Sequence, residues 1–530
     1  MRRISVAVLS LLLVLGVSGI AFAGPGSVVI KTDGDITAKF GAQVRMIPTY
    51  EQNWDFGFRE KTGDGRFTVH VNEAGTVGQG YIRSEDRLYF NFAKGDIWDV
   101  YFALEFDDVL SSRTGDRVRT IQGDFSAFGV ERLQATIKLP WIWSRFHTGW
   151  DVYTVDLDAG SLVYTDDDPG FWLTGGVANI DWKLGYHKVV ESNRRITSAD
   201  RVAANNITNT GYDNDRDSYS IRVNYTLFKD TKFGLIYAFN DQKVRGSNPT
   251  SDPCGLPANN TCQNVNAHFI SPIFVGTIAG FKFAAQYSHM WGDADHMLVR
   301  GDHFNIDSNA GFGDISYDMT PWFGFRFIPH VGVLWAQGDD NATDNKLEGY
   351  VGKNFQRFIP SFGGENTILA DTNPAIGTIL YSFLPDQRGN QNAALGVGGL
   401  AGTGRGDNPG LLLVGGGLTI DPIKNWSYRT NAYYIRYDSR TSALPLVATI
   451  LAGPLGPAGT NVRLTKRDIG VEWDNEVSWW LDKNMVVKGQ FSFIFPGDAL
   501  KEINGIWQGD LSKKTDETAI RLALELLWNF

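Results

Sequence analysis

The stretch TAIRLALELLWNF, residues 518–530, decides the fold that the sequence predicts. Every second residue from Ile520 to Phe530 is apolar, whereas Arg521 and Glu525 occupy alternate positions. Residues two apart share one face of a β-strand, while residues three and four apart share one face of a helix. Alternation over about ten residues is typical of a strand that spans a membrane, with lipid on one side and water on the other. The end of the chain is therefore predicted to be a transmembrane strand.

The same alternation recurs throughout the chain, in eighteen segments. They lie near 34–47, 80–93, 97–107, 129–139, 143–151, 171–178, 180–190, 217–228, 231–240, 267–278, 281–291, 304–318, 321–336, 410–420, 425–438, 467–480, 484–496 and 518–530. The pattern predicts an all-β fold, a single antiparallel transmembrane β-barrel of about 18 strands, with 16 as the alternative.

The connections between these segments alternate between long and short ones. The long ones cover about 48–79, 108–128, 152–170, 191–216, 241–266, 292–303, 337–409, 439–466 and 497–517. Outer-membrane barrels have short periplasmic turns and longer extracellular loops. Trp residues also gather beside the short connections, as at Trp141 and Trp322, where a periplasmic aromatic girdle is expected. Both termini are therefore predicted to lie on the periplasmic side.

Composition excludes several other classes of protein. The chain has 530 residues, 59 of them Gly, with 13% aromatic and 20% charged residues and a formal net charge of −10. No segment after the N-terminus has the ~20 apolar residues that a membrane helix needs. Abundant aromatics argue against disorder, and the acidic balance argues against a nucleic-acid partner. Sequence motifs typical of hydrolases, metalloproteases and nucleotide-binding sites are absent, so we expect no enzyme, cofactor or metal site.

The N-terminus predicts export. Arg2 and Arg3 precede an almost wholly apolar run from Ile4 to Val17, and Ala21-Phe22-Ala23 supplies a cleavage pattern. This combination indicates a secretory signal peptide, residues 1–23, followed by one barrel domain, residues 24–530. A membrane anchor is the alternative, and the shortness of the apolar run argues against it.

Two cysteines, Cys254 and Cys262, lie eight residues apart in a loop-like stretch. In an exported chain this spacing predicts a local disulfide. A metal-binding pair is the alternative, but no His lies between or beside them.

Three parts of the sequence resemble known outer-membrane proteins. The terminal Phe530 resembles the signal that the barrel assembly machinery recognises, and Gram-negative porins of 16 and 18 strands share this ending. The segments 149–170 and 471–500 are similar to a porin-like family of anaerobic sulfate- and metal-reducing bacteria, related to alginate-export-like barrels. The resemblance implies passive transport in the outer membrane, commonly by a trimer, and does not identify a solute.

The candidate site follows from which face of each predicted strand points into the barrel. If the apolar faces meet lipid, the opposite faces line the lumen. The candidate pore-lining residues on strands are Arg45, Arg83, Arg87, Glu105, Arg132 and Arg145. By resemblance to porins, the third long loop folds inward and brings Asp166, Asp167 and Asp168 towards this basic wall. Opposed charges of this kind select ions. The alternatives are ordinary solvated aspartates or a Ca²⁺ site, although the spacing is not that of an EF-hand.

The predicted function is passive diffusion of small hydrophilic solutes or ions across the outer membrane, with outer-membrane lipid and the barrel assembly machinery as partners. Two alternatives remain. One is a scaffold barrel that sheathes an electron-transfer cytochrome. The other is an export barrel for a charged polysaccharide, which would need a strongly basic lumen.

Overall fold

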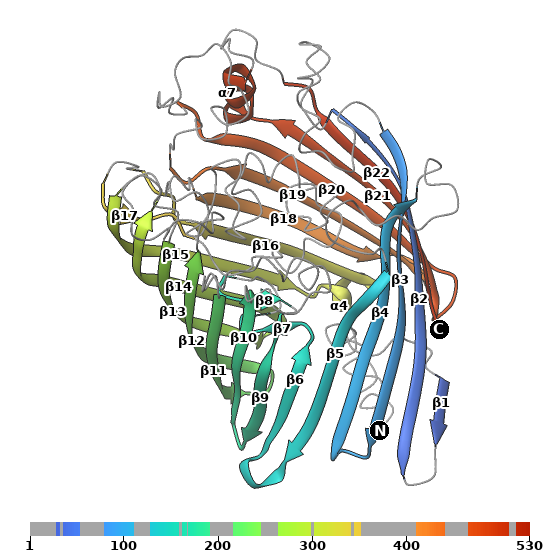
Figure 1. Ribbon diagram of the computed structural model, residues 1–530. Helices are drawn as coiled ribbons and strands as arrows, with labels where there is room; N and C mark the ends of the chain where they lie inside the picture. Colours follow the sequence, from blue (N-terminus) through green and yellow to red (C-terminus); the bar gives the residue numbers. More distant parts are fainter. Residues whose placement is uncertain are drawn as a thin grey trace, which may run out of the picture.

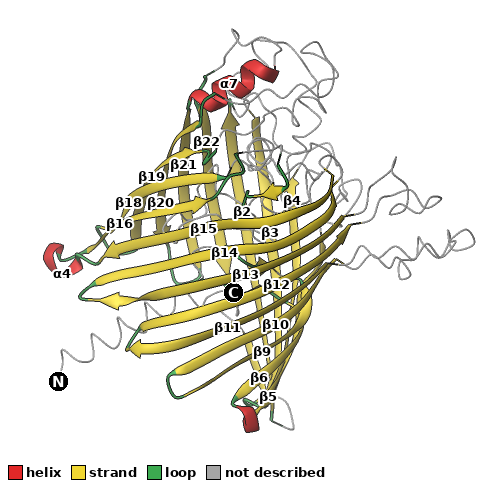
Figure 2. Ribbon diagram, turned by 90° about the vertical axis from the view of Figure 1, so that its left-hand side faces the viewer, coloured by secondary structure: helices red, strands yellow, loops and turns green. Residues whose placement is uncertain are grey.

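The computed structural model describes residues 28–31, 35–53, 79–110, 128–157, 162–166, 168–190, 216–244, 263–297, 301–340, 344–350, 410–439, 465–507 and 516–530. Within these ranges, no helix is both long and apolar enough to cross a membrane. Strands account for most of these residues, and Figures 1 and 2 show them wrapped into one curved sheet.

This sheet of 20 strands closes on itself, because its last strand pairs with one of its first. Two short strands, β1 (Val28–Lys31) and β17 (Lys346–Leu347), pair at the rims, so the closed antiparallel barrel has 18 strands. In chain order these are β2 (Ile36–Gln52), β3 (Gln79–Lys94), β4 (Trp98–Leu110), β5 (Phe128–Leu139), β6 (Ser144–Trp150), β9 (Pro169–Val177), β10 (Ile180–Val190), β11 (Arg216–Phe228), β12 (Thr231–Val244), β13 (Gln263–Ile278), β14 (Phe281–Met297), β15 (Gly301–Tyr317), β16 (Arg326–Ala336), β18 (Leu411–Asp421), β19 (Trp426–Arg436), β20 (Asp468–Trp480), β21 (Met485–Pro496) and β22 (Ala519–Asn529).

Every predicted segment coincides with a strand of the barrel, which confirms 18 strands rather than 16. The predicted short connections are also confirmed, and two of them contain a single helical turn, η3 (Pro140–Ile142) and α4 (Thr320–Phe323). A longer helix, α7 (Asp498–Trp507), follows β21.

One predicted loop, residues 292–303, is wrong. β14 continues to Met297 and β15 begins at Gly301, with Asp295 paired to His303 inside the predicted loop. The outward residues here are polar, as at Asp307, whose side chain is 68% exposed. The apolar alternation therefore stops at the membrane boundary, while the hydrogen-bonded ladder continues beyond it.

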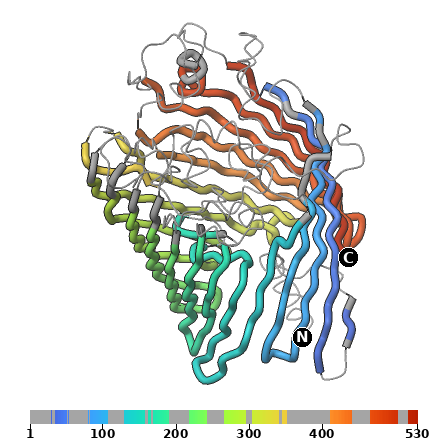
Figure 3. The backbone as a smooth tube through the Cα atoms, viewed as in Figure 1, coloured from blue at the N-terminus to red at the C-terminus, as the bar shows by residue number. Residues whose placement is uncertain are grey.

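The seam of the barrel is closed by both ends of the chain. β22 pairs with β2 from Gln43 to Gln52, and β1 pairs with the lower part of β2, residues 37–40. Phe530 exchanges backbone hydrogen bonds with Ala42, of 2.8 and 3.2 Å. Figure 3 shows the red C-terminal strands running beside the blue N-terminal ones at this seam.

The two faces of the wall differ as the alternation predicts. On β22, Leu522 and Leu524 face outward and are each 44% exposed, whereas Arg521 and Glu525 face inward and are 3% and 1% exposed. Closing the sheet satisfies the backbone polar groups of every strand, which is what a wall surrounded by hydrocarbon requires.

Part of the barrel interior is a hydrophobic core. Many inward residues of β12–β15 are apolar and fully buried, including Ile236, Phe269, Met290 and Phe304. They pack with residues of the segment between β6 and β9, such as Leu162, which is 0% exposed. Full burial of one such side chain contributes roughly 1.5–3 kcal/mol. The interior therefore has one apolar, covered side and one polar side.

Candidate functional site

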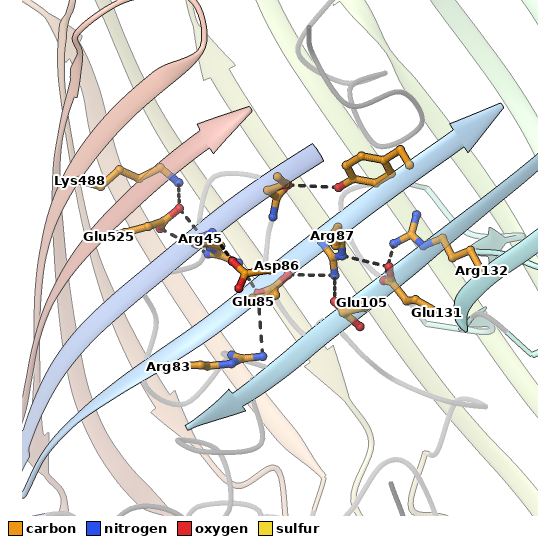
Figure 4. A network of polar contacts seen from close by, with 12 residues as sticks. Arg45, Arg83, Glu85, Asp86, Arg87, Glu105, Glu131, Arg132, Lys488 and Glu525 are labelled. Atoms are coloured by element: carbon orange, nitrogen blue, oxygen red, sulfur yellow. Dashed lines mark hydrogen bonds and ion pairs between the residues drawn. The ribbon is translucent and has the colours of Figure 1, made fainter. Parts of the chain in front are cut away.

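The polar side of the interior carries a belt of alternating charges that crosses six neighbouring strands (Figure 4). We call it the charge belt. Its members are Lys488 on β21, Glu525 on β22, Arg45 on β2, Arg83, Glu85 and Arg87 on β3, Glu105 on β4, Glu131 and Arg132 on β5, and Asp151 just after β6. Five cations thus face five carboxylates.

The belt spans the seam of the barrel. Glu525 is 1% exposed and forms ion pairs of 3.1 Å with both Lys488 Nζ and Arg45 Nε. The other end of the Arg45 guanidinium, Nη1, lies 2.6 Å from Glu85 Oε2. Since β22 and β2 are the last and first barrel strands, these charge-assisted contacts stabilise the closure as well as lining the lumen.

Arg87 is the hub of the belt. Its Nη2 lies 2.9 Å from Glu85 and 2.5 Å from Glu105, and its Nε lies 3.0 Å from Glu131. Beyond it, Arg132 lies 3.3 Å from Glu131 and 3.5 Å from Asp151. One guanidinium therefore balances carboxylates from three strands.

Glu131 was not predicted to line the lumen, because strict alternation puts it on the same face as Leu133. The β4–β5 ladder shifts register between Ala103 and Leu104, so Arg132 pairs with Ala103 and Val130 pairs with Leu104. Glu131 is the extra residue of this β-bulge. A bulge redirects side chains locally, and here Glu131 and Arg132 both reach the belt.

Asp86 is a second carboxylate that the alternation missed. Its Oδ1 accepts a 3.1 Å hydrogen bond from the backbone N–H of Arg45, and its Oδ2 accepts a 2.8 Å bond from Ser84 Oγ. The β2–β3 register has a gap here, between the pairs Gln43–Arg87 and Met46–Ser84. The side chain of Asp86 thus replaces a backbone acceptor in the ladder.

The structure brings most of the predicted strand residues together, namely Arg45, Arg83, Arg87, Glu105 and Arg132. The sixth, Arg145, lies outside the belt and pairs at 3.7 Å with Asp99, closer to the periplasmic turns. The predicted basic wall is therefore a charge-balanced belt, because each arginine has a carboxylate beside it.

The predicted acidic residues belong to the segment between β6 and β9, residues 151–168, which we call the inserted loop. Asp166 ends the short strand β8 (Thr165–Asp166), which pairs with β7 (Tyr153–Thr154). Asp168 accepts a 2.8 Å hydrogen bond from Tyr164 Oη. Asp167, Cys254, Cys262 and the signal peptide lie outside the described residues. A constriction between these aspartates and the arginines stays a prediction.

The inserted loop folds into the barrel and docks on β10, β11 and β14 (Figure 1). Lys183 Nζ on β10 donates to the carbonyl of Thr154 at 3.0 Å, and Arg222 Nη1 on β11 donates to that of Asp156 at 2.6 Å. Tyr350, from the predicted loop 337–409, donates at 2.8 Å to the carbonyl of Leu162. These bonds fix the loop backbone above the apolar core.

Asp156 is the buried anchor of the inserted loop. Its carboxylate is 0% exposed and accepts hydrogen bonds from the backbone N–H groups of Val163 and Tyr164 and from Gln286 Nε2. Burial raises the pKa of Asp156 to about 6, although these donors and Arg222 oppose the rise. Removal from water disfavours the charged form, which is the physical cause of this direction.

Paired charges are the main chemical feature of this part of the wall. Within the described residues, no group of three or more His, Cys, Asp or Glu side chains is arranged to hold a metal ion. What the geometry provides is a lumen wall of paired charges facing a docked loop.

No protein-family model and no curated relative matches the sequence. Among solved structures, the chain is similar to OccAB2 of Acinetobacter baumannii, with a TM-score of 0.45 and 10% identity over 93% of this chain and 98% of that one. It is also similar to a BenF-like porin from Pseudomonas fluorescens Pf-5, with a TM-score of 0.45 and 11% identity over 93% of this chain and 99% of that one.

The closed 18-stranded antiparallel barrel, with its apolar exterior and polar inner belt, has the architecture of a membrane-spanning β-barrel. The narrower resemblance to alginate-export-like barrels and to proteins of sulfate- and metal-reducing bacteria stays a prediction.

Proposed function

We propose that this protein is an outer-membrane channel through which small hydrophilic solutes or ions diffuse passively. The observation that carries the proposal is the division of the interior. The inserted loop occupies the apolar side, and the charge belt lines the other. A barrel of 16–18 strands leaves an aqueous channel, and paired charges along one wall suit hydrated polar solutes.

The charge balance of the belt bears on which solutes pass. Five cations and five carboxylates lie within ion-pair distance of one another. We therefore propose weak ion selectivity. Export of a charged polysaccharide would call for a continuous basic stripe, and the carboxylates of the belt argue against that alternative.

We further propose that the narrow part of the path lies between the inserted loop and the belt. The 3.5 Å pair of Arg132 with Asp151, at the start of the loop, supports this placement. Asp166 and Asp168 would contribute negative charge on the loop side, and Asp167 would do so by its position in the sequence.

Several finer expectations remain proposals. We propose cleavage after Ala23, a disulfide between Cys254 and Cys262, recognition of Phe530 by the assembly machinery, and a homotrimer. Mass measurement of the purified protein under native and reducing conditions tests the first, second and last of these.

Swelling of proteoliposomes tests the proposed function. Vesicles that contain the folded protein should swell in isotonic solutions of small sugars or amino acids, at rates that fall with solute size. Vesicles with heat-denatured protein are the control. A correctly folded barrel that permits no swelling would contradict open diffusion, and a tightly co-purifying periplasmic cytochrome would then favour the sheath alternative.

A further inference from the structure

A second band of lumen residues lies directly below the charge belt. On each strand it is set nearer the short periplasmic turns than the belt residue of that strand. We call it the polar row. Its members are Gln43, Tyr89, Tyr101, Gln134, Thr136, His147 and Thr174, and the Asp99–Arg145 ion pair adjoins it, because Asp99 lies opposite Thr136 and Arg145 lies opposite Thr174.

Side-chain hydrogen bonds link the row from β5 to β9. Gln134 Nε2 donates to Thr136 Oγ1 at 3.1 Å. The two ring nitrogens of His147 then bridge Thr136 Oγ1 at 3.1 Å and Thr174 Oγ1 at 2.8 Å. The result is a fixed array of amide, hydroxyl and imidazole groups on the lumen wall.

The row also carries aromatic rings. Tyr89 and Tyr101 lie on adjacent strands with nearly parallel rings, 16° apart, and centroids separated by 6.5 Å. Across the ladder, Tyr89 faces Gly41 on one side and Ala103 on the other. Neither of these two neighbours has a side chain large enough to cover the ring. Its hydroxyl donates to Gln43 Oε1 at 3.3 Å.

One member of the row has an unused hydrogen-bonding group. Tyr101 is 5% exposed, and its hydroxyl has no hydrogen-bond partner among the residues that the structure describes. On the lumen face of β4, Tyr101 lies opposite Asn91 of β3 and Gln134 of β5. Buried polar groups in folded proteins are nearly always hydrogen-bonded. An unpartnered hydroxyl beside amides and a ring face therefore points to a ligand that supplies hydroxyl groups.

We propose that the polar row is a subsite for a neutral polyol of monosaccharide size with a ring. This inference rests on the proposed channel function. The face of Tyr89 takes the apolar face of the sugar ring, while Tyr101, Gln134 and Gln43 exchange hydrogen bonds with its hydroxyls. Such a ring presents both surfaces at once, whereas an ion or an open-chain polyol lacks the apolar face.

A neutral sugar fits the site better than a sugar acid. The nearest guanidinium groups, Arg87 and Arg132, already lie beside Glu105, Glu131 and Asp151. A carboxylate ligand would have to compete with these fixed carboxylates and would be repelled by them. The cation that adjoins the row, Arg145, is likewise paired with a carboxylate, Asp99, at 3.7 Å.

Single-channel recording with added solute tests the subsite. D-glucose, glycerol or glucuronate is added in increasing concentration, and the block of the ionic current is measured. The proteins compared are the wild type, Tyr101→Phe and Tyr89→Leu. Tyr219→Phe is the matched control, since Tyr219 lies on the outer face with 45% exposure. We expect glucose to interrupt the ionic current at lower concentration than glycerol or glucuronate. Tyr101→Phe should weaken this block about tenfold, and Tyr89→Leu should abolish the preference for glucose over glycerol.

The outcomes separate the subsite from the channel. The subsite would be overturned if glucose blocked the ionic current no better than glycerol, or if Tyr101→Phe left the block by glucose unchanged. Neither result would contradict the proposed channel function. If the folded protein conducts no current, saturation-transfer NMR of glucose with micelle-bound protein replaces the block. Transfer that is lost in Tyr101→Phe but kept in Tyr219→Phe would then support the subsite, and no transfer to the wild type would overturn it.

Discussion

Replacing Asp156 by Asn should remove a pH dependence from the docking of the inserted loop. In the docked loop this carboxyl is fully buried and its pKa is raised from 3.8 to about 6. The docked state therefore binds a proton more tightly than a solvated, undocked loop does. It follows that docking is strongest below about pH 3.8 and weakens as the pH rises through about 6.

The size of the effect follows from the same pKa values. A pKa change from 3.8 to about 6 corresponds to about 3 kcal/mol, or roughly 100-fold in the equilibrium between docked and undocked loop. The charged groups around the carboxyl set this value. Arg222 favours the anion, while burial in the apolar core disfavours it more strongly.

Hydrogen exchange at the amides of Val163 and Tyr164 reports this equilibrium directly, because both N–H groups donate to Asp156. After correction for intrinsic exchange, their protection should fall about 100-fold between pH 4 and pH 7.5 in the wild type. In Asp156→Asn, the side-chain oxygen still accepts these bonds but does not titrate, so protection should stay nearly constant. Asp168→Asn, in the same loop, should keep the wild-type dependence. Wild-type protection that is constant or rises with pH would refute the reasoning.

Three further predictions concern the belt, the wall and the seam. Arg87→Met removes the cation that Glu105 and Glu131 share, so it should shift the reversal potential towards cation selectivity. The control Arg326→Met, in an exposed ion pair near a short turn, should leave the reversal potential unchanged. An unchanged reversal potential in Arg87→Met would show that the belt does not face the ion path. Gly149→Ala should destabilise the folded barrel by about 3 kcal/mol or more in urea titrations. The reason is that Gly149 has φ +121° and that a Cβ would lie 1.9 Å from the Leu133 carbonyl oxygen. The control Gly489→Ala, at a position with open space around it, should be nearly neutral. Phe530→Ala keeps both backbone bonds to Ala42 and should reduce assembly in cells without slowing refolding in detergent; equal loss in both assays would make its role structural.

The strands and turns could be predicted from the sequence because the two environments of the wall differ so sharply. Lipid outside and polar groups inside impose a period of two on every crossing, as in the segment from Ile520 to Phe530. Beyond the membrane that contrast disappears. At their ends, β14 and β15 remain hydrogen-bonded to each other, but apolar and polar residues no longer alternate. For this reason the sequence of residues 292–303 resembled a loop.

The same phase argument found the arginines of the site and the partner carboxylates Glu105 and Glu525, but it missed two other carboxylates. Glu131 and Asp86 reach their positions through a bulge and a gap in the ladder, and a strict period of two cannot anticipate either. The structure therefore places more carboxylates beside these arginines than strict alternation predicts.

The docking of the inserted loop had a signal that the alternation argument did not use. On β12 and β13 several inward positions, such as Ile236, Phe269 and Ile273, are apolar like the outward ones. A strand that is apolar on both faces is covered on both faces. That pattern, together with the apolar neighbours of Asp156 in the loop, marks where the interior is filled.

The most direct test of the central claim is single-channel recording of the purified mature protein in a planar bilayer under a KCl gradient. An open path along a charge-balanced belt predicts steady ohmic openings with only a small reversal potential. A correctly folded barrel that conducts no current, or one with strong anion selectivity, would contradict the account.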